Sequence, residues 1–235
     1  MEFAILADAF SKMESTTKRL ELTQHLVELF EKTPQDVISR IIYLLQGKLR
    51  PDFEGVELGV AERLAIRAIA KSAGSDNAEK KIEEEYRKSG DLGHAASKIL
   101  EQKEQTTFMM QDITVERVYE NLFTIAKLEG SKTQDRKMKY ISGLLNDANP
   151  NEAKFILKIL LGTLRLGVAE NTVMDALAIA FTGNKENRKA LEHAYNVSSD
   201  LGKVAETIVS KGLKGIEEFE INLFNPIRPM LADRV

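Results

Sequence analysis

The sequence contains no cysteine and three histidines, His25, His94 and His193, scattered over 235 residues. Without cysteine the chain can form neither disulfides nor thiolate metal sites, and the histidines lack the spacing of metal ligands. No run approaches the roughly 20 apolar residues of a membrane-spanning helix, and the first ten residues carry Glu2 and Asp8 where a signal peptide would be basic. These absences favour a soluble, intracellular protein that has no metal centre and no membrane partner.

The sequence also lacks the strict apolar–polar alternation that indicates β-strands. Apolar residues instead recur at three- and four-residue steps, the period of an amphipathic helix, most clearly in segments 9–32, 36–47, 115–130 and 152–162. Hydrophobic residues make up 43% and charged residues 29% of the chain, which is enough apolar material for one large or two modest cores. We therefore expect an all-α fold.

Two helix starts share the same chemistry. Thr33 precedes Pro34 and Asn149 precedes Pro150, with an acidic residue two positions after each proline. A capping residue, then proline at the first helical position, then an acid in the first turn is typical of a helix N-terminus. Each pair therefore predicts a capped helix start.

The most informative internal feature is a repeat. LLQGKLR (44–50) matches LLGTLR (160–165), and LGVAE occurs at both 58–62 and 166–170. The offset falls from 115 to 108 residues between these matches because PDFEGVE (51–57) is inserted in the first copy. A third match pairs EYRKSGDLG with AYNVSSDLG at an offset of 109. The chain thus contains two copies of one helical unit.

Each copy has a Gly-x-Leu-Arg stretch between two apolar runs, at 47–50 and 162–165. Glycine commonly ends a helix in the left-handed conformation, which accounts for these glycines as turns. It does not account for the arginines. A helix that begins near Val168 or Ala169 leaves its first N–H groups unpaired, and such a terminus beside an arginine can hold an anion. The two stretches are therefore either plain turns or two phosphate clamps.

Positive charge gathers around the second copy, although the net charge of the whole chain is −3. Residues 131–168 carry seven basic and three acidic side chains, a balance of +4, so the remainder carries −7. Three basic residues fall on one face of a helix and two lie four apart on the next: Lys132, Arg136 and Lys139, then Lys154 and Lys158. A charge run is usually a solvated face, yet beside a candidate phosphate clamp it favours a polyanionic partner.

These motifs resemble a known family. GSKTQDRKMKYISGLLNDANPNEAKFILKILLGTLRLGVAENTVMDALAIAF (130–181) strongly resembles the N-terminal DNA-binding domain of ATP-dependent DNA ligases of the archaeal and eukaryotic type. The resemblance covers essentially the whole chain. The PDFEG insertion is similar to that of archaeal members, and FNPIRPMLADRV (224–235) resembles the linker into the family's catalytic domain. We assign residues 1–223 to the DNA-binding domain and 224–235 to the start of that linker.

The resemblance implies an all-helical domain of two pseudo-symmetric halves, about 1–100 and 114–223, joined by a loop at 101–113. It implies sequence-independent binding to the minor groove of nicked double-stranded DNA, within an enzyme of DNA replication, repair and recombination that works in the cytoplasm with the chromosome. Matching motifs place the DNA contacts on the two Gly-x-Leu-Arg stretches and the helix start that follows: Gly47, Lys48, Arg50, Gly162, Thr163, Arg165, Gly167 and Thr172. Thr163 stands where the first copy has Lys48, so the halves need not bind equally.

One departure from the family limits the activity expected of this chain. The family's adenylated lysine lies in a Lys-x-Asp-Gly motif, and the sequence contains no Asp-Gly dipeptide. The chain also stops at Val235, just before the catalytic domain should begin. We therefore expect a monomer that binds DNA but does not join it and that holds no cofactor, with ATP and Mg²⁺ belonging to the parent enzyme.

Two short polar stretches extend the candidate DNA contacts. STTKR (15–19) and GSKTQDR (130–136) resemble each other and the polar contact loops of the family. We add Ser131 and Lys132 to the candidates on this ground. The alternative is that this stretch simply caps a helix.

The connecting loop resembles a docking peptide for a sliding clamp. In EQKEQTTFMMQDIT (101–114), Gln105 is followed three residues later by Phe108, and Met109 stands where a second aromatic would be expected. Archaeal ligases carry such a motif at this place. Packing of Phe108 into the seam between the halves is the alternative.

Two other classes of function stand against DNA binding. A helical-repeat scaffold would bind protein helices in an apolar groove, insensitive to salt, and would leave the hinge arginines incidental. A small-molecule enzyme would need clustered acids, bases or nucleophiles, and the sequence shows none beyond ordinary surface charge.

Overall fold

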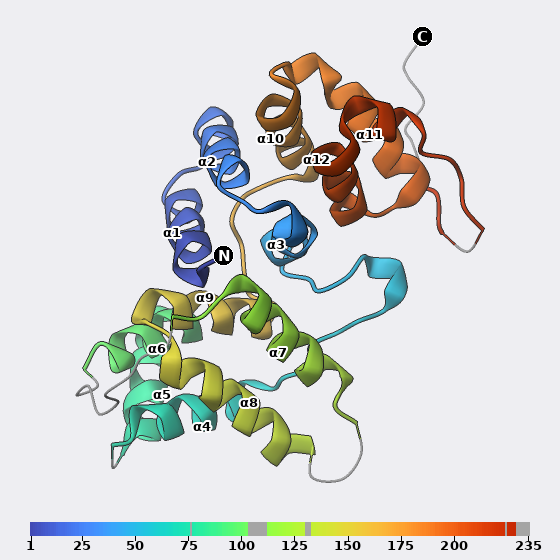
Figure 1. Ribbon diagram of the computed structural model, residues 1–235. Helices are drawn as coiled ribbons and strands as arrows, with labels where there is room; N and C mark the ends of the chain where they lie inside the picture. The colour runs from blue at the N-terminus through green and yellow to red at the C-terminus, as the bar shows by residue number, and fades with distance from the viewer. Residues whose placement is uncertain (76, 103–111, 130–132, 224, 229–235) are drawn as a thin grey trace. The chain divides into compact units, whose positions relative to one another are not determined.

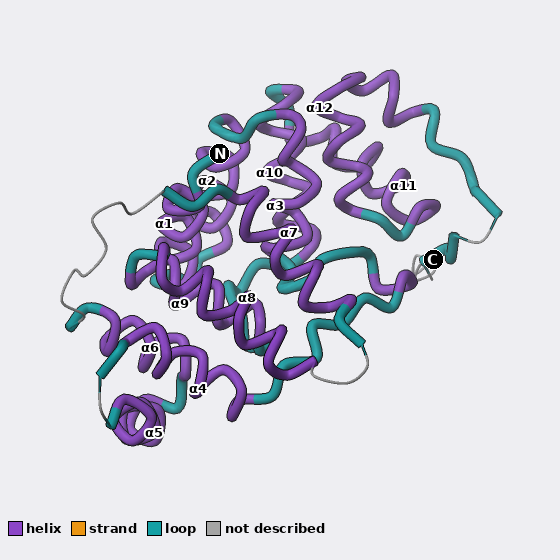
Figure 2. The backbone as a smooth tube through the Cα atoms, turned by 60° about the horizontal axis from the view of Figure 1, so that its bottom comes forward, coloured by secondary structure: helices purple, strands orange, loops and turns teal. Residues whose placement is uncertain are grey.

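A computed structural model of the chain describes residues 1–75, 77–102, 112–129, 133–223 and 225–228. Within these ranges the chain forms twelve α-helices and no β-strand (Figures 1 and 2). The expectation of an all-α fold is confirmed. The helices are α1 (Phe3–Glu14), α2 (Arg19–Glu31), α3 (Ile38–Leu45), α4 (Glu62–Ala73), α5 (Ala78–Ser89), α6 (Leu92–Leu100), α7 (Val115–Lys127), α8 (Thr133–Asp147), α9 (Pro150–Leu160), α10 (Glu170–Thr182), α11 (Arg188–Ser198) and α12 (Leu201–Glu217).

The helices group into two compact units that interleave along the chain. Unit 1 consists of Met1–Phe10, Gly47–Leu49 and Val56–Leu164, and unit 2 consists of Ser11–Gln46, Arg50–Gly55 and Arg165–Val235. These units are defined by contacts, whereas the halves expected at about 1–100 and 114–223 are defined by the sequence repeat and stay a prediction. Each unit takes helices from both copies of the repeat. The chain passes between units after Phe10 within α1, at both ends of Gly47–Leu49, after Gly55 and after Leu164.

Unit 1 is built on two helix pairs, α4 with α8 and α6 with α9, and α5 packs on α4 and α6. The apolar face of α9 lies in this core, where Phe155 is fully buried. Its ring meets the ring of Phe10 edge to face, with centroids 5.3 Å apart, an arrangement that aromatic quadrupoles favour.

Unit 2 has the same internal pairing. Helix α2 packs on α10 and α3 packs on α12, and α11 contacts both α10 and α12. Figure 1 shows α2, in blue, beside α10, in brown, although about 150 residues of chain separate them. Under the repeat offsets these pairs correspond to α8 with α4 and α9 with α6. The helix before each hinge therefore packs on a helix of the other copy: α3 packs on α12, and α9 packs on α6.

Glycines allow the second pair in each unit to approach closely. A Cβ added to Gly93 on α6 would lie 2.7 Å from the carbonyl oxygen of Lys154 on α9. A Cβ added to Gly202 on α12 would lie 2.4 Å from the ring of Tyr43 on α3. Since real Cβ atoms do not approach so closely, glycine at these two equivalent positions is a packing requirement.

The expected helix starts have different outcomes. Asn149 forms a complete capping box with Glu152, and Pro150 begins α9, as predicted. The prediction for Thr33 is wrong. Its hydroxyl donates to the carbonyl of Leu29 at the end of α2, a short 3₁₀ turn at Gln35–Val37 follows Pro34, and α3 starts only at Ile38. The periodic segment 9–32 is also two helices, because the chain leaves helical geometry at 15–18.

Candidate nucleic-acid interface

The second hinge, residues 161–170, begins with a Schellman turn. The amide of Gly162 donates to Ile159 O at 3.1 Å, and the amide of Thr163 donates to Lys158 O at 2.9 Å. Gly162 has φ of +66°, in the left-handed region that favours glycine. The glycine therefore ends α9 as the turn interpretation predicts, and the chain leaves the helix in a fixed direction.

The chain then presents Arg165 and starts a new helix. Arg165 is exposed and has no ion pair or hydrogen bond among the described residues. Gly167 again has a positive φ, +67°, and α10 follows with Ala169 as its N-cap and no side chain bonded to that end. An arginine without a partner among the described residues thus precedes, by five positions, a helix start without a side-chain cap.

The first hinge, residues 46–62, repeats this backbone with more contacts. Gly47 and Gly59 have φ of +67° and +51°, and α4 begins after Ala61, again without a capping side chain. The inserted residues form a 3₁₀ turn, from which the carboxylate of Glu54 lies 3.8 Å from Arg50. Arg50 is thus partly neutralised within its own hinge, whereas Arg165 is not.

The hinges meet inside unit 1. A Cβ at Gly47 would lie 3.8 Å from the Cβ of Leu164, so the two stretches are within van der Waals distance there. Leu49 is fully buried, and the hydroxyl of Tyr119 donates to its carbonyl oxygen. The apolar residue of the first Gly-x-Leu-Arg stretch thus anchors the hinge in the core, and Lys48 and Arg50 on either side of it are half-buried.

The acid at each new helix start accepts a hydrogen bond from a tyrosine. Tyr195 donates to Glu170 at 2.5 Å, and Tyr86 donates to Glu62 at 2.8 Å at the equivalent place. Burial, and then the Glu170 carboxylate, raise the pKa of Tyr195. In unit 2 the guanidinium of Arg228 adds an ion pair of 2.9 Å to Glu170 and lies 4.4 Å over the ring of Tyr195. The second helix start is therefore the more firmly fixed.

Some expected site residues are not placed at a surface. Thr172 is 4% exposed, so its hydroxyl lies in the core of unit 2, and its amide donates to Ala169 O at 2.8 Å. Lys158 is 8% exposed and pairs with Asp91 at 2.7 Å, so it adds little to the positive surface expected on α9. Five other candidates lie outside the described residues: Ser131, Lys132, Gln105, Phe108 and Met109.

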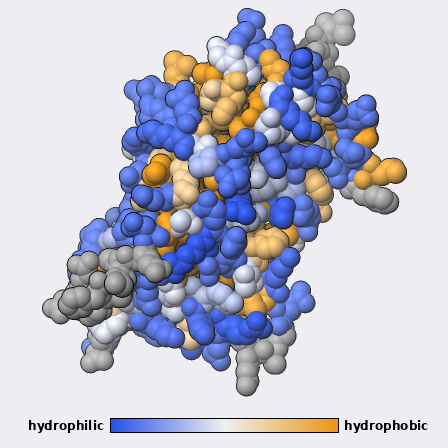
Figure 3. Space-filling view, viewed as in Figure 1, coloured by the Kyte–Doolittle hydropathy of each residue, from blue (hydrophilic) through white to orange (hydrophobic). Residues whose placement is uncertain are grey.

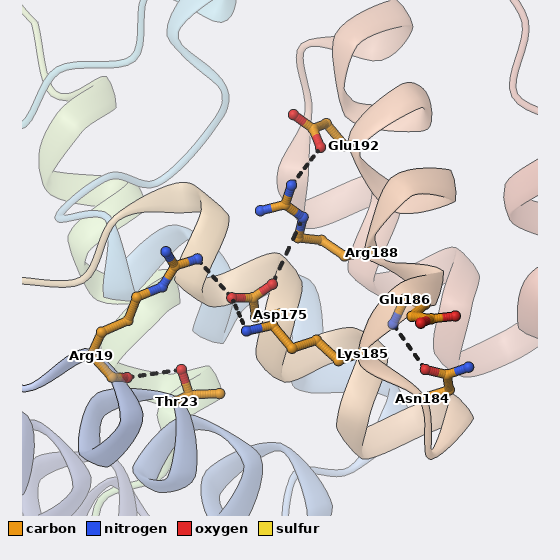
Figure 4. A network of polar contacts seen from close by, with 8 residues as sticks. All are labelled: Arg19, Thr23, Asp175, Asn184, Lys185, Glu186, Arg188 and Glu192. Carbon is orange, nitrogen blue, oxygen red and sulfur yellow. Dashed lines mark hydrogen bonds and ion pairs between the residues drawn. The ribbon is translucent and has the colours of Figure 1, made fainter.

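The sequence reasoning missed an ionic cluster in unit 2. Asp175 on α10 is fully buried, and three cations surround its carboxylate: Arg19 at 2.7 Å, Lys185 at 3.2 Å and Arg188 at 3.7 Å. Figure 4 shows Arg19 reaching it from α2, and Lys185 and Arg188 reaching it from the turn that leads into α11. A single acid within the apolar run VMDALAIA was the available signal, because a buried carboxylate needs charged partners.

A family model described as DNA ligase N terminus matches residues 2–178. The chain belongs to this family. Both hinges fall within the matched region, so the repeated Gly-x-Leu-Arg stretches are part of a DNA ligase N terminus.

Similar proteins cover the whole chain. It is 79% identical over 235 residues to a DNA ligase of Nitrosopumilus maritimus (strain SCM1) and 64% identical over 235 residues to a DNA ligase of Cenarchaeum symbiosum (strain A). It is 44% identical over 242 residues to DNA ligase 2 of Thermofilum pendens (strain DSM 2475 / Hrk 5). In each case all of this chain is covered but only 40% of the relative.

On the face shown in Figure 3, hydrophilic residues predominate and hydrophobic ones form separate patches. None of the described helices combines the length and the apolar character needed to cross a bilayer. The same residues contain no group of three or more His, Cys, Asp or Glu side chains arranged to hold a metal ion.

Proposed function

We propose that this DNA ligase N terminus binds double-stranded DNA through its phosphate backbone, independent of sequence. The observation that carries the proposal is the duplicated hinge, in which left-handed glycines precede an arginine and an uncapped helix start. Gly47, Lys48 and Arg50 form one contact set, and Gly162, Thr163, Arg165 and Gly167 form the other.

The chemistry of the hinges suits phosphate. Glycine has no side chain to keep a ligand from the backbone amides, and the first N–H groups of a helix favour an anion. Arg165 is exposed and has no competing acid among the described residues, so its guanidinium is available for a bidentate phosphate contact. Phosphate oxygens carry no base identity, and the resulting affinity is blind to sequence.

The finer features of the proposal follow from the ligases that the chain resembles. The DNA would be nicked and bound on its minor groove, and the parent enzyme would join it with ATP and Mg²⁺ during replication, repair and recombination. This chain, without a Lys-x-Asp-Gly motif, would contribute binding as a monomer and no joining. The 101–113 loop would dock on a sliding clamp through Gln105, Phe108 and Met109. Ser131 and Lys132 would extend the DNA contacts, and the protein would act in the cytoplasm.

Binding of a protein helix is the second candidate, and the surface favours it less. A scaffold of that kind needs an apolar groove. The cavity between α4, α5 and the start of α8 is lined by arginine, lysine and glutamate side chains as well as apolar ones, so it does not offer such a groove.

A salt-titrated binding assay tests the proposal. Fluorescence anisotropy would measure the affinity of the chain and of Arg165→Ala for nicked and intact duplexes of several sequences. Because each neutralised phosphate releases counterions, Arg165→Ala should make the slope of log affinity against log salt shallower by about one unit. At 0.15 M salt the affinity should fall about fivefold on every duplex. Arg50→Ala should have the smaller effect, since Glu54 already holds that arginine.

Lys189→Ala is the matched control, because Lys189 is an exposed cation on α11 outside the hinges. It removes the same charge and should leave the slope unchanged. Phosphate recognition would be contradicted if the DNA affinity did not change with salt concentration, or if the arginine substitutions weakened binding to only one DNA sequence. The hinge would then be only a turn between helices.

A further inference from the structure

Unit 1 contains an open cavity of about 680 Å³ between α4, α5 and the start of α8. Arg63, Arg67 and Lys137 contribute cations to its lining, Glu79 and Glu83 contribute acids, and Gly59 of the first hinge forms part of its edge. The cavity thus adjoins one of the stretches to which the proposed function assigns DNA contacts.

The cations of this cavity are available to a ligand. Arg63 and Arg67 lie one helical turn apart on α4, and both are exposed. Neither has an ion pair or a hydrogen bond among the described residues. The amine of Lys137 is 3.3 Å from the carbonyl oxygen of Gly59, a contact that leaves its charge uncompensated. Three positive charges therefore line a space with room for a polar group.

The acids of the cavity oppose these charges only in part. Glu83 is 3.6 Å from Arg87, an exposed residue of the same helix that does not line the cavity. Glu79 has no such partner among the described residues. The effective charge facing the space is therefore positive, with Glu79 as its main opponent.

The equivalent place in unit 2 shows what this arrangement of helices can hold. By the repeat offsets of 108 and 109 residues, Arg67 corresponds to Asp175, and Glu79 corresponds to Arg188. In unit 2 the carboxylate of Asp175 is buried at this position and is surrounded by Arg19, Lys185 and Arg188 (Figure 4). Unit 2 thus supplies its own oxyanion between these helices, while unit 1 has an arginine at that position and an open cavity.

We propose that the cavity of unit 1 binds a phosphate of the DNA backbone between Arg63, Arg67 and Lys137, as a contact additional to the two hinges. The inference rests on the proposed function, because DNA is taken as the source of the phosphate. Two arginines on successive turns suit the phosphate oxygens, since the guanidinium offers a planar pair of donors. The ligand takes the place that an internal carboxylate has in unit 2.

The test compares variants of the 235-residue chain in the same anisotropy assay. Arg63→Ala/Arg67→Ala should bind nicked and intact duplexes about five- to twenty-fold more weakly at 0.15 M salt, with a salt slope shallower by one to two units. Glu79→Gln should tighten binding about twofold, because it removes the acid that opposes the phosphate. Both arginines are exposed and unpaired, so the unfolding midpoint of the double variant should match that of the parent chain.

Arg87→Ala is the matched control, because it removes an exposed cation from α5 that does not line the cavity. Its DNA affinity should be unchanged. A second arm measures binding of fluorescent ATP, a free phosphate ligand, which neither the unmodified chain nor the double variant should bind. Loss of ATP binding with unchanged DNA binding in the double variant would overturn the proposal, as would an unchanged salt slope.

The two proposals fail in different ways. If the parent chain does not bind duplex DNA, the proposed function is wrong. If the parent chain binds DNA, Arg165→Ala weakens it and Arg63→Ala/Arg67→Ala does not, only the cavity contact is wrong.

Discussion

The two units pair their helices in the same way, but the polar contacts between the paired helices differ. At the start of α6 in unit 1, Asp91 accepts a 2.7 Å ion pair from Lys158 of α9. At the start of α12 in unit 2, the equivalent Asp200 accepts a 2.8 Å hydrogen bond from Tyr43 of α3. Lys158 and Tyr43 are themselves equivalent by the 115-residue offset. The two contacts occupy equivalent positions, but one is an ion pair and the other is a hydrogen bond from a neutral hydroxyl.

The same difference appears between the first helix pairs. Unit 2 joins α2, α10 and α11 through the buried carboxylate of Asp175, whereas unit 1 leaves the equivalent space open beside Arg67. The packing of helices therefore tolerates an exchange of polar partners, provided that every buried charge still has one. The units differ in how many of their charged side chains have a partner within the protein and how many are available to a ligand.

The largest expected effect comes from the glycines that both units require. Gly93→Ala and Gly202→Ala should each lower the free energy of unfolding by about 2–3 kcal/mol, because the added methyl forces two buried helices apart. Chemical denaturation of each variant measures this. Gly143→Ala on α8 is the control, since nothing lies within 4 Å of its added Cβ, and alanine there should stabilise the helix by up to about 1 kcal/mol. Equal effects at all three positions would contradict the close approach.

The next largest effect compares the stability supplied by the Asp91–Lys158 ion pair with that supplied by the Tyr43–Asp200 hydrogen bond. Asp91→Asn keeps an acceptor for the amide of His94 but leaves the nearly buried ammonium of Lys158 without an anion. We expect a loss of about 2 kcal/mol, less than for a fully buried pair because the Asp91 side chain is 33% exposed. Tyr43→Phe, the matched change in unit 2, should lose about 1 kcal/mol.

The pH dependence of the stability lost in Asp91→Asn tests whether the charge of Asp91 is the cause of that loss. Burial opposes ionisation of Asp91, but Lys158 and the amides of His94 and Gly93 outweigh it, so its pKa lies below the ordinary 3.8. A carboxyl whose folded pKa is lowered stabilises the protein above its unfolded pKa and loses that contribution as the pH falls through the folded pKa. The difference between parent and variant should therefore be complete at pH 6 and shrink below pH 3.8. A difference that persists at pH 2 would show that charge is not the cause.

The smallest effect compares the two tyrosines at the helix starts. Tyr195 is 5% exposed and its hydroxyl donates to Glu170, so Tyr195→Phe should cost about 1 kcal/mol in unfolding free energy. Tyr86 makes the same contact with Glu62 at the surface. Tyr86→Phe should therefore lower the free energy of unfolding by only about 0.3 kcal/mol. Thermal unfolding of the pair of variants checks the order, and the reverse order would mean that Arg228 alone fixes Glu170.

Local features of the fold could be predicted from the sequence because they depend on neighbouring residues. The capping box at Asn149 and the left-handed glycines at 47 and 162 follow from rules that span four or five positions. Thr33 shows the limit of such rules. The hydroxyl of a threonine can bond the preceding turn as readily as the following one, and here it donates to Leu29 O.

The partners of each helix could not be predicted in this way. The repeat in the sequence names no partner for any helix. In the structure α3 packs on α12 and α9 packs on α6, pairings that depend on which way the chain leaves each hinge. The burial of Thr172 follows from the same cause, since α10 is packed between α2, α11 and α12. A motif marked the region of the candidate site, but only the packing shows which of its side chains reach the surface.

The interleaving of the units also sets an order for synthesis. Helices α2 and α3 end by Leu45, whereas α10 and α12, against which they pack, span Glu170–Thr182 and Leu201–Glu217. A ribosome adds about 5–20 residues per second, so the first helices wait on the order of ten seconds for their partners. Unit 1, most of which is the continuous stretch Val56–Leu164, has its helices available first. The nascent chain therefore completes the middle of its sequence before its beginning.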